Sequence, residues 1–337
     1  MMRRAGALLL VAALIGAALV PLILGGSAAL LASLRLPAQA YATILVLVCA
    51  SWLLRALKQS LLMRRLRLRC EAWRVFAISQ ATEFAFLATP GGVGGYAAGI
   101  FYLRRAGASY AAATAISAAD QILDLVFFAA AIPVALLFLV DAPEVGALRG
   151  VARAAAALTA TVLVLVWLLH RPLARWLFGD GETPSWLERL PYLRKHGISL
   201  RGFLNNLRAQ LRALSDGSPT FLAALCVCTA LQWATRYGVF WTIMNLLGQP
   251  VPFALVFLLQ GVVLHAAQWT GAPAGAGGAD VGLAASLAAF APAETIATAL
   301  LLWRFATLHL SLFSGLVSIY ALRFPARAPA IAEESAM

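Results

Sequence analysis

Charged, amide and hydroxyl side chains recur at helical spacing within apolar stretches of this chain. One group follows the spacing i, i+3, i+4, i+7, which places its members on one helix face: Ser117, Asp120, Gln121 and Asp124. Two further polar faces consist of Thr229, Gln232 and Arg236 and of Arg304, Thr307, Ser311 and Ser314. A charged side chain near the centre of a bilayer costs about 2.5–3.5 kcal/mol, so these groups are candidates for function.

Two roles fit these polar faces. In the first, they surround a cavity whose arginines attract an anionic headgroup and whose carboxylates balance charge or carry a proton; the groups concerned are Arg236, Arg304, Asp120 and Asp124. In the second, the same groups form a buried network that only joins the helices. Two carboxylates, two guanidiniums and many hydroxyls exceed what simple pairing needs, which favours the cavity.

Three other titratable side chains lie in apolar surroundings. Glu83 is expected either to pair with an arginine, across the cavity or at Arg104 or Arg105, or to act on a ligand or proton. His265 and His309 are expected to be core histidines rather than proton carriers.

A Pro/Gly-rich motif occurs twice, 183 residues apart. The first copy, Thr89 to Gly95, reads TPGGVGG, and the second, Ala272 to Gly278, reads APAGAGG. Proline and clustered glycines interrupt helices, and non-helical backbone is tolerated at membrane depth only beside protein or a water-filled cavity. Two breaks at matched positions therefore predict a binding site, to which we assign Pro90, Gly92, Gly94 and Gly95 of the first copy and Pro273, Gly275, Gly277, Gly278 and Asp280 of the second.

The glycines of the two motifs have two possible roles. Each motif begins a new helix, whose free N–H groups near Gly94 to Tyr96 and Gly277 to Ala279 are expected to hold an anion such as phosphate. Asp280 competes with this role in the second copy, because its carboxylate can cap the helix instead. The alternative is that the glycines only allow tight packing.

The composition is that of an integral membrane protein. Hydrophobic residues make up 62% of the chain, charged residues only 12%, and the mean hydropathy is +0.85. Two segments, Val75 to Leu103 and Phe253 to Ala291, are predicted to be re-entrant hairpins with a Pro/Gly break. Six runs are long enough to cross about 30 Å of hydrocarbon: Ala7 to Leu34, Ala38 to Leu57, Ser109 to Val140, Leu148 to His170, Pro219 to Leu247 and Pro292 to Tyr320.

The distribution of arginine and lysine predicts the orientation. Basic residues between 55 and 74, at Arg104 and Arg105, in the loop 171–218 and in the tail 324–337 mark the cytoplasmic side, so both termini are expected there. Arg55 and Lys58 are counted with the first of these loops. Each half then reads span, span, hairpin, span, and this odd number of crossings predicts an inverted repeat with halves 1–140 and 148–320 in a single membrane domain 1–337.

Several other classes of function are not expected. The net charge of +12 lies beside apolar runs, where it fixes orientation, so nucleic acid is not a predicted partner. Cys49, Cys70, Cys226 and Cys228 support neither a disulfide framework nor a metal site. No metal-ligand spacing, nucleophile–base pair or nucleotide loop is found, so we predict neither an enzyme nor a cofactor.

The segments Glu83 to Asp124 and Pro273 to Gly315 resemble the flippase-like membrane domain shared by lysylphosphatidylglycerol synthases and stand-alone relatives, some of them associated with hopanoid biosynthesis. The similarity covers nearly the whole chain. It rests on the Pro/Gly signature, on an L-x-R-x-G step, on a Leu-Asp pair and on the arginine of the last span, that is, on Leu103, Arg105, Gly107, Leu123, Asp124 and Arg304. In the second copy Ala274 replaces the first glycine of the motif.

This resemblance implies movement of a lipid between leaflets, with the two hairpins meeting near the membrane middle. No soluble aminoacyl-transfer domain follows the last span, so synthase activity is not expected. We predict an all-α polytopic protein of the bacterial inner membrane, a transporter or flippase that moves an anionic-headgroup or isoprenoid-type lipid by alternating access. The alternative is a non-transporting partner that binds a lipid or a membrane-bound lipid-biosynthesis enzyme.

Overall fold

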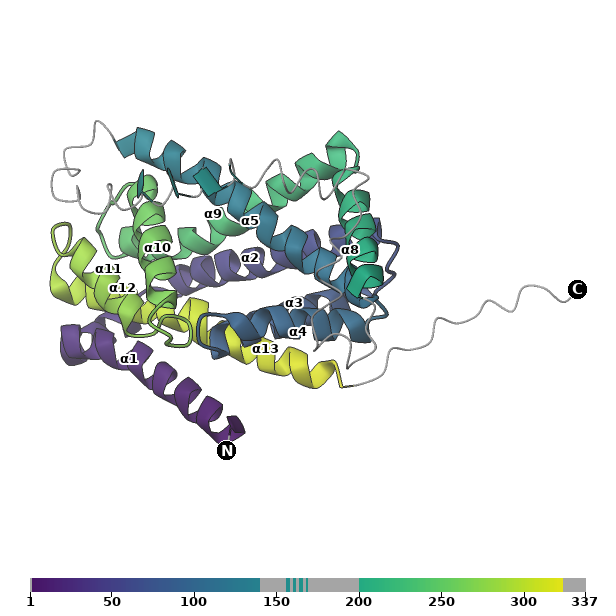
Figure 1. Cartoon of the computed structure of the whole chain (residues 1–337). Helices are drawn as coiled ribbons and strands as arrows, with labels where there is room; N and C mark the ends of the chain where they lie inside the picture. Colours follow the sequence, from purple (N-terminus) through teal and green to yellow (C-terminus); the bar gives the residue numbers. More distant parts are fainter. Residues whose placement is uncertain are drawn as a thin grey trace, which may run out of the picture.

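The computed structural model describes residues 2–139 and 200–323, together with residues 156–157, 160–161, 164–165 and 168. Within these residues the chain is helical, with no β-strand (Figure 1). Most of the predicted fourth span, Leu148 to His170, lies outside the described residues, as do the first part of the predicted loop 171–218 and the tail 324–337. The all-α prediction is confirmed for the part of the chain that is described.

The helices follow one another in two matching series. The first comprises α1 (Met2–Leu34), α2 (Ala38–Arg65), α3 (Ala72–Ala88), α4 (Val93–Arg105) and α5 (Tyr110–Leu139). The second comprises α8 (Leu200–Ser215), α9 (Pro219–Leu246), α10 (Phe253–Gln268), α11 (Gly278–Leu287), α12 (Ala293–Arg304), a π-helical segment (Phe305–His309) and α13 (Leu310–Ala321). At the offset of 183 residues, α2 to α5 correspond to α9 to α13.

Three helices among the described residues are long and apolar enough to cross a membrane. They are Ala38–Arg65, Tyr110–Leu139 and Ala293–Ala321, and they coincide with the second, third and last predicted spans. A fourth candidate is the pair Gly202–Ser215 and Pro219–Leu246, which is bent by 92°. The chain is therefore a membrane protein by composition and helix length, while the predicted number of six spans and the re-entrant path of the hairpins remain predictions.

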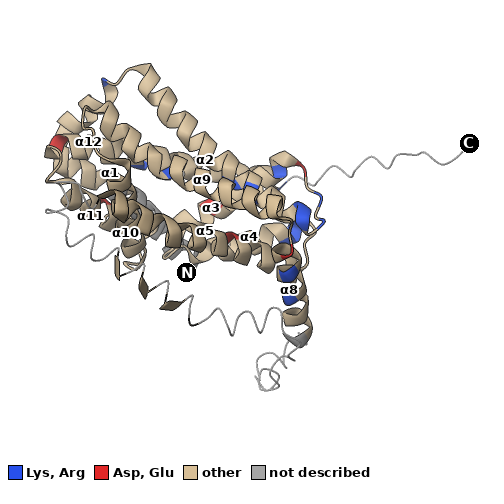
Figure 2. Ribbon diagram, turned by 90° about the horizontal axis from the view of Figure 1, so that it is seen from above, with Lys and Arg blue, Asp and Glu red and all other residues tan. Residues whose placement is uncertain are grey.

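Two predicted segments differ in the structure from the sequence prediction. α1 bends at Gly26, whose φ of 58° and ψ of −154° are not helical. The predicted loop 171–218 contains α8, which lies almost perpendicular to α9. Basic residues gather over α8 and the neighbouring helix ends, at one end of the bundle (Figure 2).

The two series interlock. The broken pair α3–α4 packs through α3 against α13, the last helix of the second series, and α10 packs against α5, the last helix of the first. α1 lies against α12 and α8 against α5, while α2 and α9 pack against each other. Each series therefore completes the packing of the other, and neither forms a separate body.

Two hydrophobic clusters lie on either side of a polar middle layer. One includes Ile44 of α2, Phe128 of α5 and Phe240 of α9. The other includes Leu62 of α2 and Leu225 of α9 from the same helices, together with residues of α3, α4 and α8. Because α2, α5 and α9 contribute to both clusters, the polar residues between these positions are held in the middle of the bundle.

Candidate functional site

The two Pro/Gly motifs form helix breaks that meet. The first break separates α3 from α4 and the second separates α10 from α11. Pro90 and Pro273 face each other in an isolated antiparallel bridge. Backbone segments that lie 183 residues apart in the sequence are therefore adjacent in the fold.

The breaks share a backbone conformation at matched positions. Gly91 and Gly92 have φ angles of 61° and 73°, and the corresponding Ala274 and Gly275 have φ angles of 53° and 60°. The left-handed region costs an alanine about 1–2 kcal/mol. The substitution that distinguishes the second motif therefore keeps the geometry and adds backbone strain.

The glycines at the start of α4 allow close packing. A Cβ atom built on Gly94 would lie 2.5 Å from Cγ2 of Thr89, and one built on Gly95 would lie 2.1 Å from the Phe86 ring. Both distances are shorter than van der Waals contact allows. Packing is thus a role of these two residues, which do not line the cavity described below.

Four of the amides at the predicted anion sites already donate to protein acceptors, which argues against anion binding by those amides. Their hydrogen bonds are Gly94 N–H to Thr89 Oγ1 at 2.9 Å, Gly95 N–H to Gly92 O at 3.0 Å, Gly277 N–H to Asp280 Oδ2 at 2.9 Å and Ala279 N–H to Gly275 O at 2.9 Å. The Thr89 hydroxyl at the first break and the Asp280 carboxylate just after the second motif satisfy the first free donors, and only the capping by Asp280 was among the expectations.

A cavity of about 560 Å³ lies where the breaks meet the polar middle layer. It is lined from both series, by the two breaks and by residues of α2 to α5, α9, α10 and α12. Eight predicted site residues line it: Glu83, Gly92, Gln121, Asp124, Arg236, Gly275, Arg304 and Thr307. Aromatic side chains such as Tyr96, Phe128 and Trp303 complete the walls, so the cavity is both charged and apolar.

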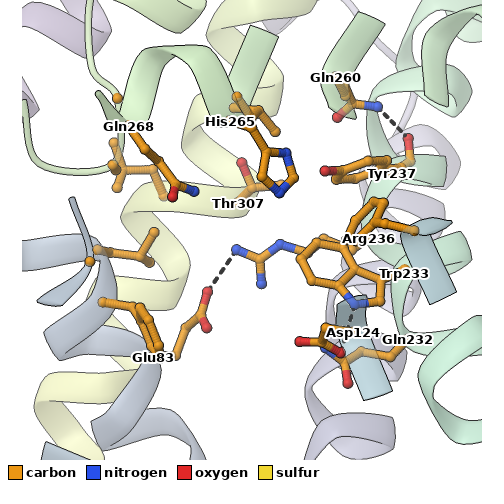
Figure 3. Close-up of a pocket in the computed structure, with 18 of the residues that line it drawn as sticks. Glu83, Asp124, Gln232, Trp233, Arg236, Tyr237, Gln260, His265, Gln268 and Thr307 are labelled. Atoms are coloured by element: carbon orange, nitrogen blue, oxygen red, sulfur yellow. Dashed lines mark hydrogen bonds and ion pairs between the residues drawn. The ribbon is translucent and has the colours of Figure 1, made fainter. Parts of the chain in front are cut away.

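Glu83 joins three helices at the cavity. Its carboxylate accepts a hydrogen bond of 2.7 Å from Nη2 of Arg236 on α9 and forms a salt bridge with Arg55 on α2. Figure 3 shows Arg236 reaching across the cavity to Glu83. The partners are thus the cross-cavity arginine and Arg55, and not Arg104 or Arg105.

A second charged group centres on Lys58, whose side chain is 0% exposed. Its Nζ lies 2.7 Å from Oδ1 of Asp120 and 2.8 Å from Oδ1 of Asp124. The indole of Trp233 donates a further hydrogen bond of 3.0 Å to Asp124. Asp124 lines the cavity, whereas Asp120 is not part of its wall.

The assignment of Arg55 and Lys58 to a cytoplasmic loop is wrong. α2 continues to Arg65, so both residues lie within the helix. Strong helix formers such as Ala56, Leu57 and Leu62 sustain it. The spacing of three residues puts Arg55 and Lys58 on one face, a signal that identifies them as a polar stripe like the others.

Arg304 and Asp280 form a buried clamp on the second break. Nε and Nη2 of Arg304 donate to the two carboxylate oxygens of Asp280 at 2.6 and 2.9 Å, and Nη1 donates to the Ala274 carbonyl at 3.3 Å. Asp280 is 0% exposed and also accepts from the Gly277 amide. The carboxylate thus neutralises the guanidinium that we predicted to attract an anion.

Several other predicted site residues lie outside the cavity wall. Arg105 is exposed at the end of α4, with its guanidinium over the Phe101 ring and roughly 13 Å along the helix from Tyr96. Arg105 thus lies outside the cavity wall, and the L-x-R-x-G step marks the end of α4. Four others outside the wall belong to the two breaks or to the start of α11, namely Pro90, Pro273, Gly277 and Gly278.

The sequence prediction missed the polar residues of α10. Gln260, His265 and Gln268 line the cavity, and His265 and Gln268 are exposed. The prediction of His265 as a core histidine is wrong; its Nδ1 lies 2.6 Å from the Gly261 carbonyl of the same helix, and the ring borders the cavity. The sequence signal that could have identified these three residues is the recurrence of polar side chains within the apolar run of α10.

Comparison with known families places the residues of this site within the matched family region. The family model described as the lysylphosphatidylglycerol synthase TM region matches residues 6–315, which include both breaks and every charged group of the site. The chain belongs to this family. A curated relative from Archaeoglobus fulgidus, described as a UPF0104 membrane protein, is 25% identical over 279 residues, covering 80% of this chain and 82% of the relative.

Proposed function

We propose that this member of the family is a lipid transporter, which moves an amphipathic lipid across the bacterial inner membrane without changing it chemically. The observation that carries the proposal is the cavity between the two breaks, since it combines buried charges with aromatic and aliphatic walls. A lipid headgroup needs charged partners in a place that hydrocarbon can also reach. The family description, which names a lipid synthase, supports a lipid as the ligand.

An anionic headgroup is the ligand that the charges favour beside Glu83. Arg55 and Arg236 share this one carboxylate, so beside Glu83 the two guanidiniums exceed their acid partner by one charge, which the second carboxylate of the Lys58 group balances. Guanidinium forks bind phosphate oxygens in the same way as carboxylate oxygens. A phosphate can therefore take up the free donors of Arg236 or displace Glu83 from them.

Alternating access follows from the interlocked packing. Because α3 packs against α13 and α10 against α5, a shift of one series moves a wall of the cavity that the other series completes. The basic end of the bundle around α8 (Figure 2) is the end that we assign to the cytoplasm. The distribution of basic residues in the sequence places both termini on that side.

Reconstitution tests the proposal. The full chain is placed in liposomes that carry fluorescent phospholipids with different headgroups in one leaflet, and their appearance in the other leaflet is followed. We expect accelerated transfer of at least one anionic lipid, reduced at least tenfold in Arg236→Ala. Arg105→Ala, which removes an exposed arginine outside the cavity wall, serves as the matched control and keeps the wild-type rate.

Two results would contradict this function. Transfer no faster than in empty liposomes for every headgroup, together with tight retention of a lipid after extraction, indicates the non-transporting lipid-binding partner. Equal transfer by wild type and Arg236→Ala removes the charged cavity from the mechanism.

A further inference from the structure

The exposed lining residues of the cavity gather on one side of the polar layer. They come from the first break, α4, α5 and the end of α10, and they are Gly91, Tyr96, Leu125, His265 and Gln268. The charged residues Glu83 and Arg304 and the aromatic residue Trp303 on other walls are buried. Because α5 packs against both α4 and α10, this opening lies over the face of α5 between those two helices. We refer to it as the lateral mouth.

The surroundings of the lateral mouth are apolar. Leu125 is 44% exposed at the opening, and its neighbours Ile122 and Val126 are exposed on the same helix. On one edge of the mouth, the exposed Val93 at the start of α4 lies close to Gly91. On the opposite edge, Trp269 follows Gln268 at the end of α10 and is 92% exposed. A mouth rimmed by such side chains borders hydrocarbon more favourably than water.

The wall of α5 changes from polar to apolar along its length. Gln121 and Asp124 line the cavity at one level, and Leu125, Ala129 and Ile132 line it over the next two turns. Tyr96 spans from α4 to this wall and donates a hydrogen bond of 3.2 Å to Gln121. A single helix therefore offers partners for a headgroup and, next to them, a surface for hydrocarbon.

The size of the cavity limits what it can enclose. A volume of about 560 Å³ lies in the range that surrounds a drug-sized ligand, so it fits a headgroup and leaves no room for two long chains. We infer that the acyl chains of the bound lipid leave the cavity through the lateral mouth and lie against Leu125, Ile122 and Trp269 while the headgroup is inside. This inference rests on the proposed function and adds that the lateral mouth holds the acyl chains of the lipid.

Photocrosslinking tests the inference whichever headgroup the lipid carries. Cells that express the full chain are grown with a diazirine-bearing fatty acid, so that their membrane lipids carry the probe in the acyl chains. The protein is extracted gently, freed of bulk lipid and illuminated, and adducts are mapped by mass spectrometry. We expect Leu125, Ile122 and Trp269 to carry at least fivefold more adduct than Val46 and Phe138, which are exposed apolar residues on α2 and at the far end of α5.

A pair of variants separates a specific site from general contact with lipid. Leu125→Trp narrows the mouth and is expected to reduce the adducts at Trp269 at least threefold, whereas Phe138→Trp leaves them unchanged. Equal adducts at the mouth and the control positions, or none at the mouth, would overturn the inference.

Transfer assays on the same preparations keep this inference and the proposed function apart. Lipid transfer without preferential labelling at the mouth is consistent with the proposed transport function but refutes the acyl-chain site at the lateral mouth. Preferential labelling without transfer supports the mouth as an acyl-chain site and refutes transport.

Discussion

The two helix breaks share a pair of left-handed backbone positions but are held by different side chains. At the second break the buried pair Arg304 and Asp280 fastens the chain to α12. At the first, the position that matches Arg304 is Gln121, which accepts a hydrogen bond from the hydroxyl of Tyr96, and the position that matches Asp280 is Ala97. One break is thus fixed by charge, while the other is held by uncharged contacts beside the lateral mouth.

The comparison suggests a division of labour between the series. A buried ion pair resists separation strongly, because breaking it leaves a charge without a partner in a low-dielectric site. Hydroxyl and ring contacts at a partly exposed break cost less to rearrange. We therefore expect the first break to move during transport and the second to stay in place.

The largest expected effect comes from removal of the clamp. Asp280→Ala leaves the Arg304 guanidinium buried without its carboxylate, and we expect a loss of about 3–5 kcal/mol in the free energy of unfolding. Thermal unfolding in detergent, followed by the intrinsic tryptophan fluorescence, measures it. Asp216→Ala, at an exposed aspartate after α8, is the control, and a similar loss there would refute a special role for the clamp.

A steric change at the first break is expected to be the next largest. Gly95→Ala places a methyl group against the Phe86 ring, for which overpacking costs about 1–3 kcal/mol, and it is expected to slow lipid transfer as well. Gly238→Ala on α9 meets no atom within 4 Å, so it should leave transfer unchanged and stabilise the helix by about 0.5–1 kcal/mol. If Gly95→Ala combined with Phe86→Ala is no better than Gly95→Ala alone, the steric explanation fails.

The matched left-handed positions give a smaller and opposite pair of effects. Ala274→Gly removes backbone strain at a φ of 53° and is expected to stabilise the protein by about 1 kcal/mol, whereas Gly91→Ala at its counterpart destabilises it by a similar amount. Denaturant unfolding of the two variants checks the signs. Effects of the same sign at both positions would show that the two breaks are not equivalent.

The smallest effect on stability, and the sharpest test of the comparison, comes from copying the clamp. Ala97→Asp combined with Gln121→Arg places the Asp280 and Arg304 pair at the corresponding positions of the first series. In this more exposed setting the pair should add no more than about 1 kcal/mol. We expect the double variant to slow lipid transfer severalfold, because the new pair fastens the first break. Gln121→Arg alone is the control, because it lacks the acid partner. Unchanged transfer in the double variant would contradict a moving first break.

Local patterns were sufficient to predict the elements of the site but not all of its pairs. Proline and glycine spacing located both breaks, and helical spacing identified the stripes that contain Asp124, Arg236 and Arg304. Charge counting misplaced Arg55 and Lys58, because a basic residue near a helix end has the same sequence signal whether it meets lipid headgroups or buried carboxylates. Only the fold brings Asp120 and Asp124 of α5 to Lys58 of α2.

The remaining errors also have a common physical cause. The N–H groups at the helix starts were expected to be free unless Asp280 capped its helix; in the structure Asp280 does so, and Thr89 supplies an acceptor that was not expected. The bridge between Pro90 and Pro273 depends on how the two series pack, which no local spacing encodes.

The π-helical segment Phe305–His309 follows directly after Arg304 within an otherwise α-helical rod. Such a segment contains one residue more than an α-helix needs for the same rise. If the same residues formed a regular α-helix instead, everything before this segment would be rotated by about 100° relative to α13. The extra residue thus sets the rotational alignment that aims Arg304 at the second break.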